Sequence, residues 1–385
     1  MSIVSESPLH AAPTTTNPAD HRQISETFAR LNTNGLLAGL QVTIANNSDT
    51  ISLSFGLSAP RQPLTTDTPV PWLCAAKPLT SYVVVAALHQ LGIKANTSLL
   101  SFVPELDGRV PFDTTVAEML THGIYWEGKD GDSGTKTGAV NSSPTGESDS
   151  DWCPYLTPGT TIMSGRRLDD GIHRYDVQHG WALGALAAER ATGMPFAALA
   201  ETLLFAPLGM SHSSYLPPQP SVGVRTELYV RQGDELKPAG LSSDQLNVVR
   251  PGYSLWSTAN DIVRFYQHLR SDSNPVLDQM LAVQTDRLTT DRRQNLTYGM
   301  GIYRGSSVDE ICQPDAAGHN GYETAIGFCE RNVAVGVFTN GILHSPLLER
   351  MRLRAVLRAV SAHPLFRSDT QLFPDAYSHT NSPRF

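Results

Sequence analysis

A cysteine and a lysine, Cys74 and Lys77, stand three residues apart at the start of an apolar stretch. Residues three apart on a helix are neighbours on its surface, so this spacing predicts a thiol beside an amine. A thiol at the N-terminal end of a helix, next to a cation, is biased toward the nucleophilic thiolate. The pair therefore predicts covalent acyl chemistry on sulfur. The alternative is that Cys74 is a small core residue and that Lys77 only extends its amine to solvent.

The helix that carries this pair is expected to be buried. Residues 82–88 are apolar on every side of a helix, which is typical of a helix surrounded by protein. Pro78 falls in the predicted first turn. A backbone N–H has no partner within the helix there, so proline is compatible with this position.

Composition restricts the class of protein. The chain has 385 residues, 40% of them hydrophobic and 17% charged, with a net charge of -8, as in ordinary soluble proteins. The sequence has no basic stripe, so we expect no nucleic-acid partner. No apolar run is long enough to span a membrane, so we expect no membrane partner. The N-terminus lacks the features of a secretory signal, which predicts a cytoplasmic protein. Four scattered cysteines without a CxxC pair predict reduced thiols and no metal, and we expect no cofactor.

The predicted elements form an α+β order. Near the N-terminus we expect a helix over 20–31 and a hairpin of strands 40–45 and 51–56, because the apolar spacing changes from helical to alternating. The end of the chain predicts a strand over 298–303, a hairpin of 325–329 and 333–340, and a helix over 346–361. Between them, helices are expected over 115–120, 181–192, 195–204 and from a cap at Ser257 or Thr258 to about Leu269.

This order predicts an antiparallel sheet formed by both chain ends, flanked by helices, with an inserted mainly helical region. The expected division is a disordered leader over 1–22, a sheet region over 23–66 and 285–362, a helical region over 67–284 that carries the nucleophile helix, and a C-terminal tail over 363–385. Residues 127–150 are rich in Gly, Ser, Thr and Asp and predict a surface loop or insert.

Several short motifs, taken together and in order, give the chain a family resemblance. They are Leu73 to Pro78, Leu99 to Leu106, Val116 to His122, Trp181 to Gly193, Ala206 to Met210, Leu255 to Asp261 and Gly318 to Gly321. From about residue 23 to 362 the chain resembles the serine β-lactamase and penicillin-binding-protein superfamily. Within it, the chain is most similar to the class C β-lactamase, esterase and transacylase branch. The resemblance implies a β-lactamase-like fold and a covalent acyl-enzyme.

The resemblance assigns roles to particular residues. Cys74 stands where the family has its nucleophilic serine, and the lysine that follows, Lys77, is kept. Tyr175 falls at the tyrosine of the family's Tyr-x-Asn motif, as the candidate general acid or base. Val177 stands at the asparagine position, and Gln178 is the nearest amide. Tyr175 could instead be a buried aromatic residue whose hydroxyl group is satisfied.

The family's third motif corresponds to His319 and Gly321, with His319 in place of a lysine. His319 is expected to help bind a substrate carboxylate or carbonyl, although a histidine at a wet strand edge is the alternative. The backbone N–H groups of Cys74 and Tyr322 are expected to form an oxyanion hole. A second pair of matching patterns, SxxK over 133–136 and KTG over 136–138, lies in the polar stretch and is not expected to be the catalytic motif.

The cysteine gives the predicted chemistry a direction. Amines and thiols react with esters in competition with water. They compete more effectively for a thioester than for an oxygen ester. We therefore expect acyl transfer through Cys74 to an amine, thiol or alcohol, from a small-molecule or peptidyl donor, with a carrier-bound donor as one option. The alternatives are a hydrolase of small esters or amides and a non-catalytic descendant that binds a ligand in the same cleft.

Overall fold

The computed structural model describes residues 21–127, 164–176, 179–216, 226–238, 249–270, 274–282, 284–289, 295–304, 316–321, 325–330, 332–343 and 345–367. The expected leader up to residue 20, nearly all of the polar stretch over 127–150 and most of the expected tail lie outside the described residues. None of the described helices is by itself long and apolar enough to cross a membrane.

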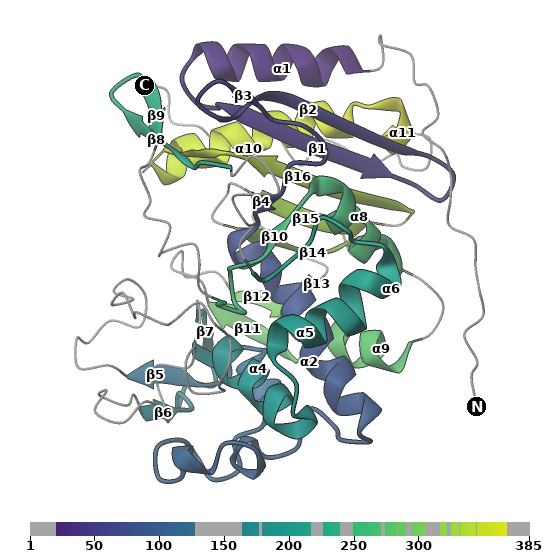
Figure 1. Ribbon diagram of the computed structural model, residues 1–385. Coiled ribbons are helices and arrows are strands. Elements are labelled where there is room, and N and C mark those ends of the chain that lie inside the picture. Colours follow the sequence, from purple (N-terminus) through teal and green to yellow (C-terminus); the bar gives the residue numbers. More distant parts are fainter. Residues whose placement is uncertain are drawn as a thin grey trace.

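A large sheet is the centre of the fold (Figure 1). Across the described residues it holds ten strands in the order β3-β2-β1-β16-β15-β14-β13-β12-β11-β7, antiparallel except for the pair β11 and β7. The strands are β1 (Gly39–Ala45), β2 (Thr50–Ala59), β3 (Gln62–Pro63), β7 (His173–Arg174), β11 (Thr285–Thr289), β12 (Asn295–Tyr298), β13 (Tyr303–Arg304), β14 (Ala316–Gly321), β15 (Ala325–Glu330) and β16 (Val333–Thr339). The two ends of the chain meet where β1 pairs with β16. The predicted α+β fold is therefore confirmed.

Side chains of β1 and β16 alternate between two cores, one on each face of the sheet. Val42 and Val335 face a core shared with α1 (Arg22–Thr33) and α10 (Pro346–Ser361). Ala334 and Phe338 face the opposite core, shared with α2 (Lys77–Gln90), α4 (His179–Thr192) and α8 (Ala259–His268). Both strands are buried along their whole length, as expected for a sheet covered by helices on both faces.

Helix α8 lies unusually close to the sheet. Gly327 and Gly336 are opposite one another on β15 and β16. A Cβ at Gly336 would lie 2.8 Å from the carbonyl oxygen of Ala259, and a Cβ at Gly327 would clash with the ring of Tyr266. The two glycines thus form the flat surface on which α8 packs, because a strand without side chains allows close backbone approach.

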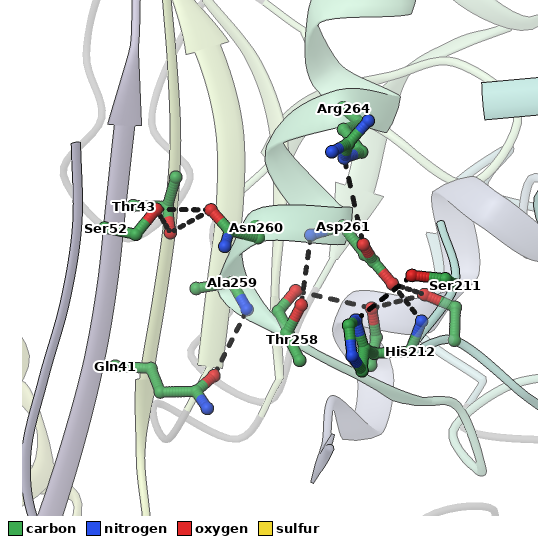
Figure 2. Close-up of polar contacts among 12 residues, drawn as sticks. Gln41, Thr43, Ser52, Ser211, His212, Thr258, Ala259, Asn260, Asp261 and Arg264 are labelled. Atoms are coloured by element: carbon green, nitrogen blue, oxygen red, sulfur yellow. Dashed lines mark hydrogen bonds and ion pairs between the residues drawn. The ribbon is translucent and has the colours of Figure 1, made fainter. Parts of the chain in front are cut away.

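Polar contacts fix the start of α8 (Figure 2). Thr258 is the N-cap residue, and its Oγ1 accepts a hydrogen bond from the N–H of Asp261 at 3.2 Å. The buried Asp261 carboxylate accepts from the N–H of His212 at 2.8 Å and from the Oγ of Ser213 at 2.9 Å. On the sheet side, the N–H of Ala259 donates to Gln41 Oε1 at 3.2 Å. Of the two caps that the sequence predicts, Ser257 and Thr258, the structure uses Thr258.

The remaining elements are short helical segments and three small sheets. The helical elements are η2 (Leu73–Ala76), η3 (Leu99–Ser101), η4 (Pro104–Leu106), α3 (Val116–Met119), α5 (Phe196–Ala200), the π-helical η5 (Glu201–Phe205), α6 (Ala206–Leu208), α9 (Pro275–Leu281) and α11 (Pro364–Arg367), of which α11 lies beside α10. The small sheets pair β4 (Val70–Pro71) with β10 (Trp256–Ser257), β5 (Tyr125–Glu127) with β6 (Ser164–Arg166), and β8 (Tyr229–Gln232) with β9 (Glu235–Pro238) and β17 (Gly341–Ile342).

Two predicted elements differ from the structure. The expected strand over 298–303 is wrong: β12 ends at Tyr298 and β13 begins at Tyr303, and the chain reverses between them. Gly301 has a φ of +75° in this turn, which glycine adopts without strain. The helix expected over 195–204 is a continuous helical segment up to Leu208 that includes the π-helical turn η5.

Candidate active site

The thiol of Cys74 lies on a 3₁₀ turn. We expected Cys74 and Lys77 on one α-helix, but Cys74 belongs to η2, and Lys77 is the first residue of α2. Side chains three apart eclipse one another in a 3₁₀ turn, so the predicted proximity of thiol and amine is kept. Leu73, just before the cysteine, has a φ of +49°, a region that L-residues other than Asn, Asp and Gly rarely adopt. Strained backbone of this kind often accompanies functional sites.

Lys77 is fully buried, whereas Cys74 is half-buried. The Nζ of Lys77 donates a hydrogen bond to the carbonyl oxygen of Gly252 at 3.2 Å and interacts with the Cys74 thiol. It also lies 5.2 Å from the ring centroids of both Tyr175 and Trp181. The lysine therefore does not extend to solvent, contrary to the simpler interpretation of its position.

Burial changes the protonation of this lysine. Desolvation lowers the pKa of Lys77, and the negative charges of Cys74 and Asp176 oppose this effect only in part. A buried amine with a lowered pKa is neutral over a wider pH range, and a neutral amine can accept a proton. The location of Lys77 beside a partly accessible thiol thus provides a base for that thiol.

Tyr175 lies on the other side of the thiol, in the segment just before α4. Its hydroxyl group is hydrogen-bonded with Cys74, and burial, followed by the charge of Cys74, raises its pKa well above the ordinary value. The side chain is therefore a neutral phenol, able to donate a hydrogen bond. Its ring stacks on the ring of His122, with 4.5 Å between centroids. His122 Nδ1 in turn accepts the N–H of Asp176 at 2.8 Å.

Asp176 holds the beginning of α4 in place. Its carboxylate accepts from the N–H of Gly180 at 2.7 Å and forms an ion pair with His179 Nδ1 at 2.8 Å. Burial alone would raise the pKa of Asp176, but the charge of His179 and these hydrogen bonds hold it well below its usual range. Burial would likewise lower the pKa of His179, and the charge of Asp176 overcomes this and raises it. The two shifts favour the charged form of the pair, and its acidic member acts electrostatically on Lys77.

The remaining predicted substrate-binding residues are only partly described. The backbone of His319 and Gly321 belongs to β14, where His319 is paired with Gly327 of β15. The turn η2 packs against both of these strands, so this strand segment lies beside the segment that carries Cys74. Gln178, Val177 and Tyr322 lie outside the described residues, as do the SxxK and KTG patterns at 133–138. The proposed roles of these residues stay predictions.

Sequence reasoning did not identify four parts of the site: Asp176, His179, Trp181 and the segment 250–254. Asp176 stands just before a strong helix, which is a capping pattern and could have drawn attention to it. His122 ends one of the family-like motifs, and its ring contacts Tyr175 directly. The segment 250–254 carries no motif that the sequence could have revealed. Within the described ranges, no group of three His, Cys, Asp or Glu side chains could hold a metal ion.

The fold is a β-lactamase-like α+β fold. The beta-lactamase family model matches residues 24–359, and the chain therefore belongs to the beta-lactamase family. No curated protein sequence matches the chain.

Solved structures with the same fold have little sequence identity to this chain. "EstCE1, a hydrolase with promiscuous acyltransferase activity" has a TM-score of 0.68 at 14% identity, over 88% of this chain and 100% of that one. The LovD6 mutant of simvastatin synthase (LovD) from Aspergillus terreus has a TM-score of 0.67 at 14% identity, over 91% and 98%. D-amino acid amidase from Ochrobactrum anthropi has a TM-score of 0.66 at 15% identity, over 89% and 98%.

Proposed function

We propose that this chain is an acyl-transfer enzyme that forms a covalent acyl-thioester on Cys74. The observation that carries the proposal is that the fully buried amine of Lys77 and the half-buried phenol of Tyr175 both interact with a half-buried thiol. A base and a hydrogen-bond donor on the same nucleophile are what acyl chemistry needs. The family, and the names of structural neighbours that are hydrolases, an amidase and an acyltransferase, support this class of reaction.

The steps follow from the protonation states of these residues. The neutral Lys77 amine takes the thiol proton, and the Cys74 thiolate attacks the carbonyl carbon of the donor. The tetrahedral oxyanion collapses, the bond to the leaving group breaks, and the leaving group receives the proton from the Lys77 ammonium. The acceptor then attacks the thioester while Lys77 takes its proton, and the thiol is restored when that proton returns to sulfur. Tyr175 donates a hydrogen bond to sulfur and is the candidate proton relay.

The nature of the nucleophile favours transfer over hydrolysis. Amines and thiols compete with water more effectively for a thioester than for an oxygen ester, so Cys74 favours an amine, thiol or alcohol acceptor. Hydrolysis of small esters or amides is the second candidate and uses the same residues with water as the acceptor. A non-catalytic binding role is the third. It gives no reason to keep a desolvated amine next to a thiol.

Intact-mass spectrometry tests the proposal. The purified protein is mixed with the S-butyryl thioester of N-acetylcysteamine or with p-nitrophenyl butyrate, quenched in acid and weighed. We expect a butyryl adduct on the wild-type chain, no adduct on Cys74→Ala, and an adduct that disappears when an amine acceptor is added. An equal adduct on Cys74→Ala, or none on the wild-type chain with either donor, would refute the thioester mechanism.

Cys74→Ser separates transfer from hydrolysis. The variant carries the family's usual nucleophile on the same scaffold. We expect the ratio of amide product to free butyrate to fall relative to the wild-type protein. If the ratio stays the same, the cysteine is not the cause of a preference for transfer. A cytoplasmic location and a carrier-bound donor stay predictions that these measurements do not address.

A further inference from the structure

Arg250 is a half-buried arginine near the site. Five other arginines among the described residues form an ion pair with a carboxylate: Arg167, Arg174, Arg190, Arg231 and Arg264. Arg250 does not, within the part of the chain that the structure describes. Its NH1 donates a hydrogen bond to the hydroxyl oxygen of Tyr253 at 2.6 Å, and its guanidinium lies 5.5 Å from the centroid of that ring. A guanidinium has five N–H donors, so most of them have no carboxylate to bind.

The segment that carries Arg250 is fixed against the nucleophile helix. The carbonyl oxygen of Gly252 accepts from Lys77 Nζ, and the carbonyl oxygen of Pro251 accepts from Thr80 Oγ1. The N–H of Arg250 donates to Ser254 Oγ at 2.6 Å, and the N–H of Tyr253 donates to the carbonyl oxygen of Arg250 at 2.9 Å. The backbone of the turn that carries Arg250 and Tyr253 is thus held against Lys77 and Thr80.

Tyr253 connects this arginine to the thiol. Burial raises the pKa of the Tyr253 phenol, the charge of Arg250 opposes this in part, and the charge of Cys74 raises it further. Tyr253 is therefore protonated and close enough to Cys74 for an electrostatic interaction. Because its oxygen accepts from Arg250, its own O–H is oriented to donate elsewhere. A cation and a neutral O–H donor side by side are a typical anion-binding arrangement.

We propose that Arg250 and Tyr253 form a binding subsite for an anionic group of the substrate, a carboxylate or a phosphate, beside the thiol that carries the acyl group. The inference rests on the proposed function, because that function places the acyl group on Cys74. It also makes that function more specific: donor or acceptor is a charged molecule, and the charge lies within a few bonds of the reacting carbonyl carbon. Arg250 forms charge-assisted hydrogen bonds with the anion, and the Tyr253 hydroxyl group donates a further one.

The test uses unreactive ligands, so that it does not depend on acylation. Calorimetry compares two matched pairs: 3-(methylthio)propionate with its amide, and S-methyl-4′-phosphopantetheine with S-methylpantetheine. We expect the wild-type protein to bind the anionic member of at least one pair about tenfold more tightly, as charge-assisted hydrogen bonds do. The pair that shows the preference identifies the anion as carboxylate or phosphate.

Variants assign the preference to the arginine. Arg250→Gln should reduce the ratio of the affinity for the anionic ligand to that for its neutral partner to about one. Arg250→Lys should keep part of this preference, because the positive charge remains. Arg270→Gln, at an exposed arginine beyond α8, is the matched control and should keep the wild-type ratio. If Arg250→Gln does not fold, the wild-type preference should still fall with rising ionic strength, because salt screens the attraction.

Three outcomes would overturn the inference: equal affinity within both pairs, an unchanged ratio in Arg250→Gln, or a ratio that does not respond to salt. These differ from failure of the proposed function, which is the absence of any acyl adduct on Cys74. A protein that binds the anion but is never acylated supports the subsite and refutes the enzyme. A protein that is acylated on Cys74 but shows no preference for the anionic ligand supports the enzyme and refutes the subsite.

Discussion

The carboxylate of Asp176 lies 2.8 Å from Nδ1 of His179, at the start of the helix that also carries Trp181. Because the ring of Trp181 lies next to the amine of Lys77, this ion pair fixes one wall of the candidate site. It also places a negative charge near that amine, which opposes the loss of its proton. The stability of the fold and the basicity of the site are therefore connected through one carboxylate.

The first prediction concerns the pH dependence of this pair. The pKa of His179 is raised, so its stabilisation is complete below its unfolded pKa of about 6.5 and is lost as pH rises through the folded value. The pKa of Asp176 is lowered, so its stabilisation is complete above about 3.9 and is lost as pH falls through the folded value. Both contributions are complete between about pH 4 and 6.5.

Asp176→Asn should therefore lower the free energy of unfolding by about 2 kcal/mol at pH 5.5, because a charged hydrogen bond is lost, and by less at pH 9. Urea unfolding at the two pH values measures the difference. Asp170→Asn is the control, since its ion pair with Arg174 is exposed and such pairs contribute at most about 1 kcal/mol. An Asp176→Asn penalty that is equal at both pH values would contradict the argument.

Lys77→Met should separate activity from stability. A methionine of similar shape avoids the desolvation cost of the buried amine, but the Gly252 carbonyl oxygen loses its Lys77 donor. Because the two effects oppose each other, we expect the free energy of unfolding to change by about 1 kcal/mol or less. Removing the base should slow acylation of Cys74 by about 100-fold or more. Thermal unfolding and intact-mass time courses measure the two effects. A variant that is strongly destabilised, or that is acylated at the wild-type rate, would show that Lys77 has a structural role instead.

The same lysine predicts a pH profile. Because its pKa is lowered from 10.5, the fraction of neutral amine rises with pH around a midpoint below that value. The acylation rate of the wild-type protein should rise with it, and Lys77→Met should lack this rise. Measurement with a donor that does not ionise keeps the profile free of substrate titration. A midpoint at or above 10.5 would mean that the amine is not desolvated as the structure indicates.

Tyr175→Phe tests the neutral phenol. The substitution keeps the ring that stacks on His122 and lies near Lys77, and removes only the hydroxyl group. We expect little change in stability and a 10- to 100-fold slower acylation, roughly the contribution of one hydrogen bond made to a developing charge. Tyr82→Phe, at a tyrosine of α2 whose hydroxyl group contacts His268 at the end of α8, is the control. Equal effects of the two substitutions would remove Tyr175 from the mechanism.

Local patterns in the sequence predicted elements with strong local signals. The helix Pro346–Ser361 begins at proline after the capping Ser345, and this start follows from capping rules. The proximity of Cys74 to Lys77 followed from a three-residue spacing. Tyr175 was located by counting back from a helix, and the structure brings it to the thiol.

Contacts between distant segments could not be predicted in this way. Gly252 accepts from Lys77 across 175 positions of sequence, and only the folded chain brings the two together. Asp176 stands at the variable position of the Tyr-x-Asn pattern, between Tyr175 and Val177, so the motif points to no role for it. The stretch from Tyr298 to Tyr303 predicts a strand, and only the folded chain shows that it reverses direction at Gly301.

Asp261 gives a prediction on the other side of the molecule. Burial raises its pKa, although the donors His212 and Ser213 oppose this. A raised carboxyl pKa contributes stability that is complete below about 3.9 and is lost as pH rises through the folded value. Asp261→Asn keeps an oxygen for both donors (Figure 2), so it should be as stable as the wild-type protein, or more stable, at pH 7. Asp261→Ala leaves those donors without an acceptor and should cost about 1–3 kcal/mol.

Gly336 provides the last prediction, because the backbone of α8 leaves no space for a side chain at this position. A Cβ there would lie 2.8 Å from the Ala259 carbonyl oxygen, which belongs to the helix backbone and cannot rotate away. Gly336→Ala should therefore force α8 from the sheet and lower the free energy of unfolding by about 1–3 kcal/mol. Gly92→Ala is a poor control, since its φ of +70° strains any side chain; Ala334→Gly, on the same strand, is better. If urea unfolding shows Gly336→Ala to be no less stable than the wild-type protein, the close approach of helix and sheet does not constrain this fold.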